Sequence, residues 1–279
     1  MAMICIKCLK VKMNNLICGD TLTELKKIED NIFDIGITSP PYNKGDKNKG
    51  KLVDKVIYSN SSDSKGEMDY QIEQINVLNE LYRITKPGGS FFYNHKIRWV
   101  KGQMLHPILW LNATNWTIRQ EIIWNRQIAA NIRGWRFWQI EERIYWLYKP
   151  INNNKIGKEL QSKHALLTSV WNIRPEQNNP HPAPFPIELT TRAIYAILDN
   201  KQGSVIDPYC GSGTSLVSAK LLGHDYLGID ISQEYLDLAK QRLENISDRD
   251  KEKFEKEISL HKVEKTFKER KNENTILAR

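Results

Sequence analysis

The segment from Ser204 to Asp230 constrains the fold most, because it joins two short apolar strands through a glycine-containing turn and a helix. The first strand is predicted at Ser204 to Asp207, the turn at residues 208–214, the helix at 215–222 and the second strand at Tyr226 to Asp230. A second strand that ends in a carboxylate completes the arrangement with which parallel α/β sheets bind nucleosides. The segment therefore predicts an α/β fold with a parallel sheet.

The turn departs from the dinucleotide fingerprint. It has a single Gly-x-Gly, formed by Gly211 and Gly213, and Asp207 at the strand end would repel a pyrophosphate. Asp230 follows Gly213 by 17 residues and can accept hydrogen bonds from both ribose hydroxyls. A nucleoside with a cationic amino-acid arm, S-adenosylmethionine, suits both acids better than NAD or ATP. A purely structural turn is the alternative.

A second motif, Thr38-Ser39-Pro40-Pro41-Tyr42, closes the apolar run that begins at Phe33. Proline fixes φ and lacks a backbone donor, so we expect the strand to end in a rigid platform. The hydroxyl of Ser39 and the carbonyl of Pro40 would face outward as acceptors beside the ring of Tyr42. This suits a planar substrate that bears an amino group. Taken alone, a Pro-Pro turn is the simpler interpretation, and the downstream glycine turn reverses that preference.

The charge favours a polyanionic partner. The chain has 279 residues, with 41 Lys and Arg against 33 Asp and Glu and a net charge of +8. Basic proteins gain affinity for nucleic acid by neutralising phosphates. No apolar run approaches the roughly 18 residues of a membrane span. We expect one large domain over residues 14–245, with the helix from Glu234 to Glu244 running on into a charged tail over 246–279 whose mix of Lys and Glu gives little sign of a buried face.

The cysteines do not favour a metal centre. Cys5 and Cys8 form one CxxC pair, and no second pair or nearby histidine completes a zinc site. Reduced thiols and a cytoplasmic location are expected. The first residues lack the apolar core of a secretory signal, and both Met1 and Met13 remain candidate starts.

Two segments combine cations with residues suited to nucleic acid. Residues 43–66 are predicted to form a long loop that contains Lys44 and Lys47 directly after the Ser-Pro-Pro-Tyr platform. Residues 125–138 interleave three arginines with Trp135, Phe137 and Trp138. Arginine with aromatics is typical of surfaces that grip phosphates and stack on bases. The alternative is that the tryptophans are core and the arginines extend past them to solvent.

Together the motifs carry a family resemblance. Asp-Pro-Tyr-Cys-Gly-Ser-Gly-Thr at 207–214 resembles the cofactor motif of DNA amino-methyltransferases, Thr-Ser-Pro-Pro-Tyr at 38–42 resembles their catalytic motif, and 181–186 resembles the segment before the cofactor strand. The catalytic motif comes first, which is the permuted order of the β class. The resemblance implies a Rossmann-like methyltransferase fold, with a mostly parallel seven-stranded sheet and a target-recognition region inserted at 126–174.

The resemblance also implies residue roles. Asp20 would approach the cofactor adenine and Asp230 its ribose. The catalytic set is Ser39, Pro40, Pro41 and Tyr42; the cofactor set adds Phe185, Asp207, Tyr209, Gly211, Ser212 and Gly213; the DNA-binding set is Lys44, Lys47, Trp124, Arg126, Arg133 and Arg136. Trp124 matches an aromatic near the target-base pocket and is equally compatible with the core.

The implied activity is site-specific methylation of double-stranded DNA by base flipping, in a bacterial restriction-modification setting with a companion endonuclease. Serine before Pro-Pro-Tyr is typical of enzymes that methylate the N4 amine of cytosine, so cytosine is favoured over the N6 amine of adenine. A non-catalytic nucleic-acid-binding protein is the alternative from another class. Monomer and homodimer both remain open, and the recognition sequence is not encoded in any motif we identify.

Overall fold

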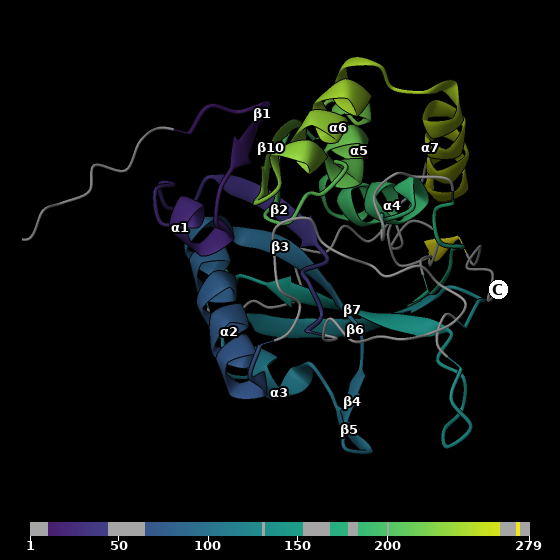
Figure 1. Ribbon diagram of the computed structural model, residues 1–279. Coiled ribbons are helices and arrows are strands. Elements are labelled where there is room, and N and C mark those ends of the chain that lie inside the picture. The colour runs from purple at the N-terminus through teal and green to yellow at the C-terminus, as the bar shows by residue number, and fades with distance from the viewer. Residues whose placement is uncertain are drawn as a thin grey trace, which may run out of the picture.

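The computed structural model describes residues 11–43, 65–129, 132–152, 168–177, 184–199, 201–262 and 272–273. Within these residues the chain forms one eight-stranded sheet and a separate hairpin (Figure 1). The large sheet has the order β1, β10, β9, β2, β3, β7, β6, β8. The strands span Asn15–Cys18 (β1), Phe33–Thr38 (β2), Thr85–His95 (β3), Thr117–Asn125 (β6), Glu141–Tyr148 (β7), Val170–Asn172 (β8), Ser204–Asp207 (β9) and Asp225–Asp230 (β10), and the hairpin pairs Arg98–Val100 (β4) with Gln103–Leu105 (β5).

The sheet is mostly parallel, as predicted. The pairings from β1 through β10, β9 and β2 to β3 are all parallel, and β7 runs antiparallel to both of its neighbours, β3 and β6. It has eight strands where seven were predicted. The additional strand is the three-residue β8, which pairs with β6 and comes from a segment whose sequence shows no regular period.

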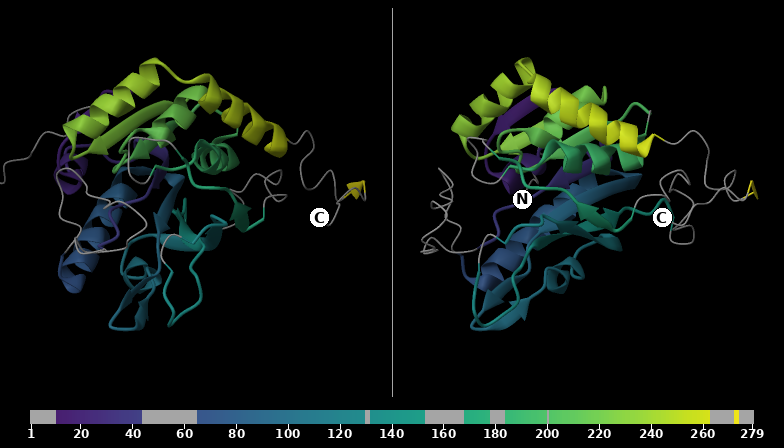
Figure 2. Two further views of the ribbon diagram at one scale, coloured as in Figure 1. Left: turned by 45° about the vertical axis from the view of Figure 1, so that its right-hand side comes forward. Right: turned by 90° about the vertical axis from the view of Figure 1, so that its right-hand side faces the viewer.

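Helices cover both faces of the sheet. They span Thr21–Leu25 (α1), Glu67–Ile84 (α2), Ile108–Leu111 (α3), Ile187–Leu198 (α4), Thr214–Leu221 (α5), Gln233–Glu244 (α6) and Asp248–His261 (α7). α1, α2 and α3 share one hydrophobic cluster, and α4 packs on the opposite face of the sheet, where it shares a second cluster with β2 (Figure 2). None of the described helices is both long and apolar enough to cross a membrane.

The C-terminal segment differs from the prediction. The helix α6 ends at Glu244, with Asn245 as its C-cap, and Ser247 caps a separate helix, α7. This helix has a packed face although its sequence is highly charged. Arg192 of α4 donates from Nε to Glu257 Oε1 at 2.6 Å and from Nη2 to Oε2 at 3.2 Å, and the two side chains are only 13% and 4% exposed. Residues 248–261 are therefore part of the folded domain, held by buried ion pairs and by Phe254, which packs against the hydrophobic cluster of α5 and α6.

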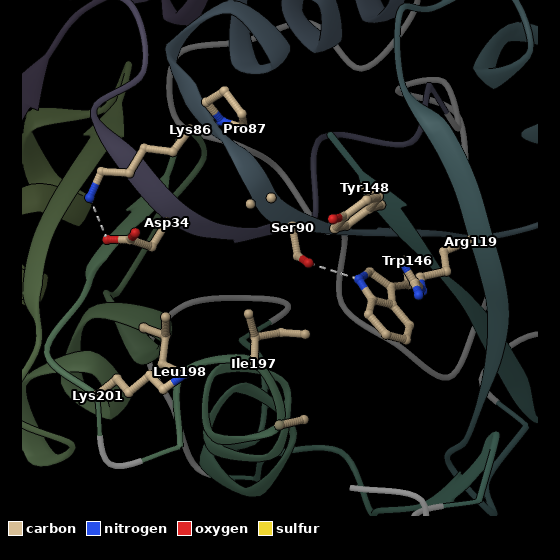
Figure 3. Close-up of a pocket in the computed structure, with 13 residues that line it drawn as sticks. Asp34, Lys86, Pro87, Ser90, Arg119, Trp146, Tyr148, Ile197, Leu198 and Lys201 are labelled. Carbon is tan, nitrogen blue, oxygen red and sulfur yellow. Dashed lines mark hydrogen bonds and ion pairs between the residues drawn. The ribbon is translucent and has the colours of Figure 1, made fainter. Parts of the chain in front are cut away.

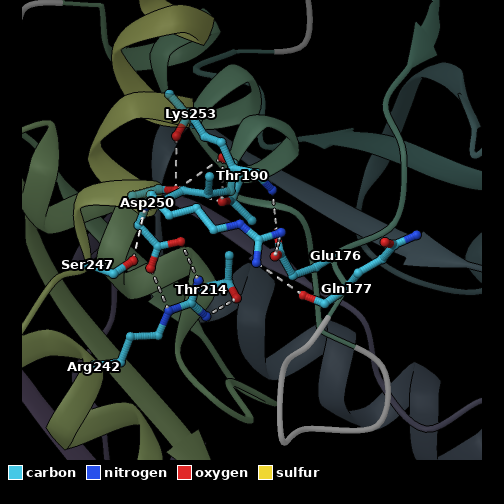
Figure 4. Close-up of polar contacts among 12 residues, drawn as sticks. Glu176, Gln177, Thr190, Thr214, Arg242, Ser247, Asp250 and Lys253 are labelled. Carbon is cyan, nitrogen blue, oxygen red and sulfur yellow. Dashed lines mark hydrogen bonds and ion pairs between the residues drawn. The ribbon is translucent and has the colours of Figure 1, made fainter.

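Two further sets of ion pairs fasten α7 (Figure 4). Arg242 of α6 makes a double contact with Asp250, at 3.1 Å from Nε and 3.1 Å from Nη2. Glu176, which follows β8, accepts from Arg249 at 3.1 Å and from Lys253 at 2.7 Å. The helix thus connects the segment after β8 with the helices on one face of the sheet.

Candidate active site

The two predicted motifs, at 38–42 and 207–214, converge at the carboxyl edge of the parallel strands. In the sheet register Cys18 lies beside Asp230, and Gly228 lies beside Asp207. β9 also pairs with β2, in parallel, on the side away from β10. The segment that begins at Ser39 therefore leaves β2 at the same edge of the sheet. Ligands of open α/β sheets bind at this edge. The structure therefore brings together two motifs that are about 170 residues apart in the chain.

The glycine turn between β9 and α5 has the backbone that a close ligand approach requires. Gly211 and Gly213 have φ values of +49° and +77°, a region that favours glycine. A Cβ on Gly213 would lie 2.9 Å from Cβ of Ala239 in α6. Ser212, between the two glycines, is buried. The turn is thus packed from behind against α6.

Two acids surround this turn. Asp230 accepts from the backbone N–H of Gly211 and of Ser232, each at 2.9 Å, and burial raises its pKa. Asp20 is exposed and caps α1 by accepting from Thr23 N at 2.9 Å. Thr21 donates to the carbonyl of Pro208 at 2.8 Å, which fixes α1 against the turn. Each carboxylate keeps lone pairs for a ligand.

Asp207 is fully internal and joins the two motifs. Its Oδ1 accepts from Thr38 Oγ1 at 2.7 Å and from Tyr209 N at 3.1 Å, and its Oδ2 accepts from Ser215 Oγ at 2.5 Å. Burial raises the pKa of Asp207 to about 6, although these hydrogen bonds act to lower it. Both oxygens contact the chain itself. Asp207 therefore holds the catalytic segment, the turn and α5 in one arrangement.

The Ser-Pro-Pro-Tyr segment forms a buried polar cluster. Ser39 Oγ lies 2.5 Å from Tyr42 Oη, which donates to Glu142 Oε2 at 2.9 Å. Asn94 Nδ2 donates to Tyr42 Oη at 2.5 Å and to Glu142 Oε2 at 2.9 Å. Tyr42 is 7% exposed, and the centre of its ring lies 4.6 Å from that of His95. The tyrosine is thus fixed at both its ring and its hydroxyl.

The prolines are fixed as well. Pro40 is buried, and the carbonyl of Pro41 accepts from Tyr70 Oη of α2 at 2.9 Å. Tyr70 also hydrogen-bonds to His95 Nε2 at 2.7 Å. The platform predicted from the two prolines is therefore supported from below by α2 and β3.

Glu142 and Asn94 were not among the predicted site residues. Glu142 is 7% exposed and forms ion pairs with Arg126 at 3.3 Å and Lys96 at 3.7 Å in addition to its hydrogen bond from Tyr42. A signal existed in the sequence. Asn94 follows the apolar run Phe91 to Tyr93, and Glu142 comes two residues before the run Ile144 to Tyr148, so each is a polar residue beside the end of an apolar run.

The remaining predicted residues lie in different settings. Lys44 and Lys47 lie outside the described residues, as do Cys5 and Cys8. Trp124 is buried at 4% exposure and donates to the carbonyl of Ile173 at 2.7 Å, which agrees with the core alternative. Phe185 is half-buried, with its ring 6.2 Å from that of Trp124. The DNA-binding set is divided: Arg126 is buried against Glu142, Arg133 is exposed and Arg136 is partly exposed.

A pocket of about 220 Å³ lies elsewhere, where β2 and β3 begin (Figure 3). Asp34 pairs there with Lys86 at 2.8 Å, and the indole of Trp146 donates to Ser90 at 3.0 Å. None of the predicted site residues lines it. The candidate active site is at the opposite end of β2.

The residues at the carboxyl edge fit a nucleoside, whereas Asp207, which was predicted to face the cationic arm of the cofactor, is occupied by contacts within the chain. A glycine turn in left-handed conformation allows close approach, and Asp20 and Asp230 supply acceptors for hydroxyl or amino groups. The acceptor platform at Ser39 belongs to the adjacent strand. The arrangement can place a nucleoside cofactor beside a second, planar substrate.

Comparison with known proteins agrees with this geometry. A family model described as DNA methylase matches residues 33–241. The type II methyltransferase M2.DpnII of Streptococcus pneumoniae is 30% identical over 251 residues, which cover 82% of this chain and 89% of that protein. The type II methyltransferase M.ScaI of Streptomyces caespitosus is 27% identical over 257 residues, which cover 81% and 80%.

Solved structures share the fold. The PvuII DNA methyltransferase, described as cytosine-N4-specific, superposes with a TM-score of 0.65 at 16% identity and covers 89% of this chain and 95% of that one. The protein TTHA0409 of Thermus thermophilus, in complex with S-adenosyl-L-methionine, has a TM-score of 0.59 at 22% identity, with coverages of 82% of this chain and 92% of that one. At these identities the likeness establishes the Rossmann-like architecture.

Proposed function

The chain belongs to the DNA methylase family, and on that premise we propose that it methylates the exocyclic N4 amine of cytosine in double-stranded DNA, using S-adenosylmethionine. The observation that carries the proposal is the hydrogen bond between Thr38 and Asp207, 2.7 Å long, which joins the acceptor platform to the glycine turn. Methyl transfer needs the two substrates side by side, and this contact would hold the cofactor-binding and base-binding parts of the site next to each other.

The residues would divide the work as follows. The cofactor supplies the methyl group, and the turn at Gly211 to Gly213 would hold it together with Asp20 and Asp230. The target base has to leave the duplex, because its amine is not accessible within the base stack. Ser39 Oγ and the carbonyl of Pro40 would accept the two amine hydrogens. That geometry withdraws the nitrogen lone pair from the ring and directs it toward the methyl group.

The cluster behind Ser39 supports this role. Tyr42 holds Ser39 at 2.5 Å, and Glu142 and Asn94 in turn hold the tyrosine hydroxyl. Such a network fixes Ser39 before the base arrives, so less ordering is needed when the amine binds. We assign catalysis to positioning. The described thiols, Cys18 and Cys210, lie outside this cluster, and Cys210 is buried.

The choice of base rests on Ser39. The alternative within the family is the N6 amine of adenine, and mass spectrometry of nucleosides separates the two. DNA incubated with the protein and S-adenosylmethionine should contain N4-methylcytosine. Methylated adenine alone would replace the cytosine assignment, and the absence of any methylated base would refute the activity and favour a nucleic-acid-binding protein without catalysis.

Variants test the residue roles. Ser39→Ala should lower methyl transfer about a hundredfold, the scale on which one positioned polar contact contributes to a transition state. Calorimetry should show nearly unchanged binding of S-adenosylmethionine, because Ser39 lies outside the glycine turn. Ser259→Ala is the matched control, since Ser259 is exposed on α7. Full activity of Ser39→Ala would refute the platform.

The setting is also a proposal. Several relatives are type II methyltransferases, and we expect this chain to protect a short DNA sequence against a companion restriction endonuclease. Long-read sequencing of DNA from cells that express the protein would identify that sequence. Light scattering would distinguish a monomer from a homodimer.

A further inference from the structure

Two arms extend from the sheet beyond the active site and carry exposed aromatic side chains. One arm is the β4–β5 hairpin, and the other is the loop between β6 and β7, described at residues 126–129 and 132–140 (Figures 1 and 2). Phe137 is 98% exposed, Trp138 61% and Trp135 58%. We call Trp99, Trp135, Phe137 and Trp138 the aromatic tip. Large aromatics gathered on a surface mark an interaction site.

The two arms support each other. The guanidinium of Arg136 lies 4.0 Å from the ring centre of Trp99 on the hairpin and 5.7 Å from that of Trp135. Trp99 and Trp135 meet edge to face at 6.3 Å. Gln139 donates to the carbonyl of Ile97 at 3.3 Å. The hairpin therefore supports the loop, and Phe137 projects into solvent from this supported segment.

The base of the loop is part of the active-site cluster. Arg126 N donates to the carbonyl of Ile140 at 2.9 Å, which closes the loop. The side chain of Arg126 contacts Glu142 at 3.3 Å, and Glu142 accepts from Tyr42 at 2.9 Å. A chain of direct contacts thus runs from the platform to the loop that carries Phe137.

The charge of the two arms indicates which class of partner they bind. Residues 96–105 and 126–140 contain six cations and no Asp or Glu: Lys96, Arg98, Lys101, Arg126, Arg133 and Arg136. Arg98 is paired with Glu67, and Arg126 with Glu142, whereas Lys101 and Arg133 are exposed. A second copy of this chain, at net charge +8, is repelled by such a surface. A duplex, with phosphates outside and bases inside, matches cations that surround an apolar tip.

We propose that the aromatic tip is a wedge and that Phe137 enters the duplex, filling the space that the extruded base leaves. This inference rests on the proposed function and identifies how the same site opens its substrate. Apolar wedges between base steps are an established means of unstacking DNA. The exposed cations would hold the flanking phosphates while Phe137 replaces the lost stacking, and Trp135 would keep the loop against the hairpin.

An abasic duplex tests the wedge without knowledge of the recognition sequence. A generic duplex with one abasic site offers a gap without the need for extrusion, whereas the intact duplex is bound through its phosphates. The wild-type protein should bind the abasic duplex about tenfold more tightly than the intact one, in line with the contribution of one aromatic stack. Phe137→Ala should lose this preference and keep its affinity for intact DNA. Phe137→Trp should retain it.

Leu260→Ala is the matched control, because Leu260 is 65% exposed on α7. Equal preference for the abasic duplex in the wild type and Phe137→Ala would overturn the wedge, as would no preference in the wild type. A change in mass by light scattering with unchanged DNA binding would also overturn it in favour of a contact between copies. Nucleoside mass spectrometry on the wild type tests the proposed function separately, since the binding assay requires no methyl transfer.

Discussion

Replacing Asp207 with asparagine tests whether burial of the ionised carboxylate that joins the two motifs lowers the free energy of unfolding. The carboxylate is 2% exposed and its pKa is raised to about 6 from 3.8, mainly by burial. At about 1.4 kcal/mol per pH unit, ionised Asp207 costs about 3 kcal/mol of stability at pH 8. Asparagine can accept from Thr38 and Tyr209 N and donate to Ser215, so it keeps the contacts and removes the charge.

The direction of the pH dependence follows from proton binding at Asp207. Between pH 3.8 and about pH 6 the folded chain binds more protons at Asp207 than the unfolded chain does, so the free energy of unfolding falls as pH rises. This contribution to stability is present below pH 3.8 and lost above about pH 6. By pH 5 about half of the loss has occurred. The wild type should therefore lose about 1.4 kcal/mol relative to Asp207→Asn between pH 5 and pH 8.

Urea unfolding at several pH values measures this difference. Other carboxylates titrate over the same range, but they are common to both proteins and cancel in the comparison. Asp237→Asn, at an exposed position on α6, is the control and should run parallel to the wild type. If Asp207→Asn also runs parallel to the wild type from pH 5 to pH 8, the carboxylate is not held in the buried, desolvated state that we describe.

Three further variants test the packing around the site. Glu257→Ala should lower the free energy of unfolding by about 3 kcal/mol, because it leaves the buried guanidinium of Arg192 without its carboxylate; an unchanged urea midpoint would show that α7 is not docked. Gly213→Ala should cost about 1 to 3 kcal/mol, since φ is +77° and Cβ would meet Ala239 at 2.9 Å; calorimetry should also show weaker binding of S-adenosylmethionine, and wild-type values would contradict the turn geometry. Glu142→Gln should lower kcat more than it raises KM, because it loosens Tyr42 without touching the cofactor turn; a change in KM alone would assign Glu142 to DNA binding.

Much of the fold was predictable because local pattern and tertiary structure agree. β9, α5 and β10 occupy nearly the predicted residues, since short apolar runs separated by a glycine turn have few other ways to fold. α7 was less predictable. Its fully buried residues, Asp250 and Glu257, are charged, and Phe254 packs on the core while only partly buried, so hydrophobic periodicity gives little indication of which face packs.

The motifs of the candidate site could be identified from the sequence, whereas the residues that contact them from behind could not. Asn94 and Glu142 come from β3 and β7, whose antiparallel pairing places them near Tyr42. No local pattern specifies which strands pair. The same reasoning applies to Trp124 and Arg126. An aromatic residue and an arginine suit a nucleic-acid surface, but both are buried where β6 pairs with β7 and β8.

The adjacency of β2 and β9 explains why the order of the motifs along the chain is immaterial to the chemistry. Ile35 and Gly36 lie beside Val205 and Ile206, and the strands run parallel, so both end at one edge. Packing explains the glycine at position 36, because a Cβ there would lie 2.3 Å from the ring of Phe91 and 3.1 Å from the side chain of Ile206. Once the strands are neighbours, Thr38 reaches Asp207 across 169 positions of sequence. A site built from strand ends depends on which strands are adjacent, and the helices and loops that connect them can follow in either order.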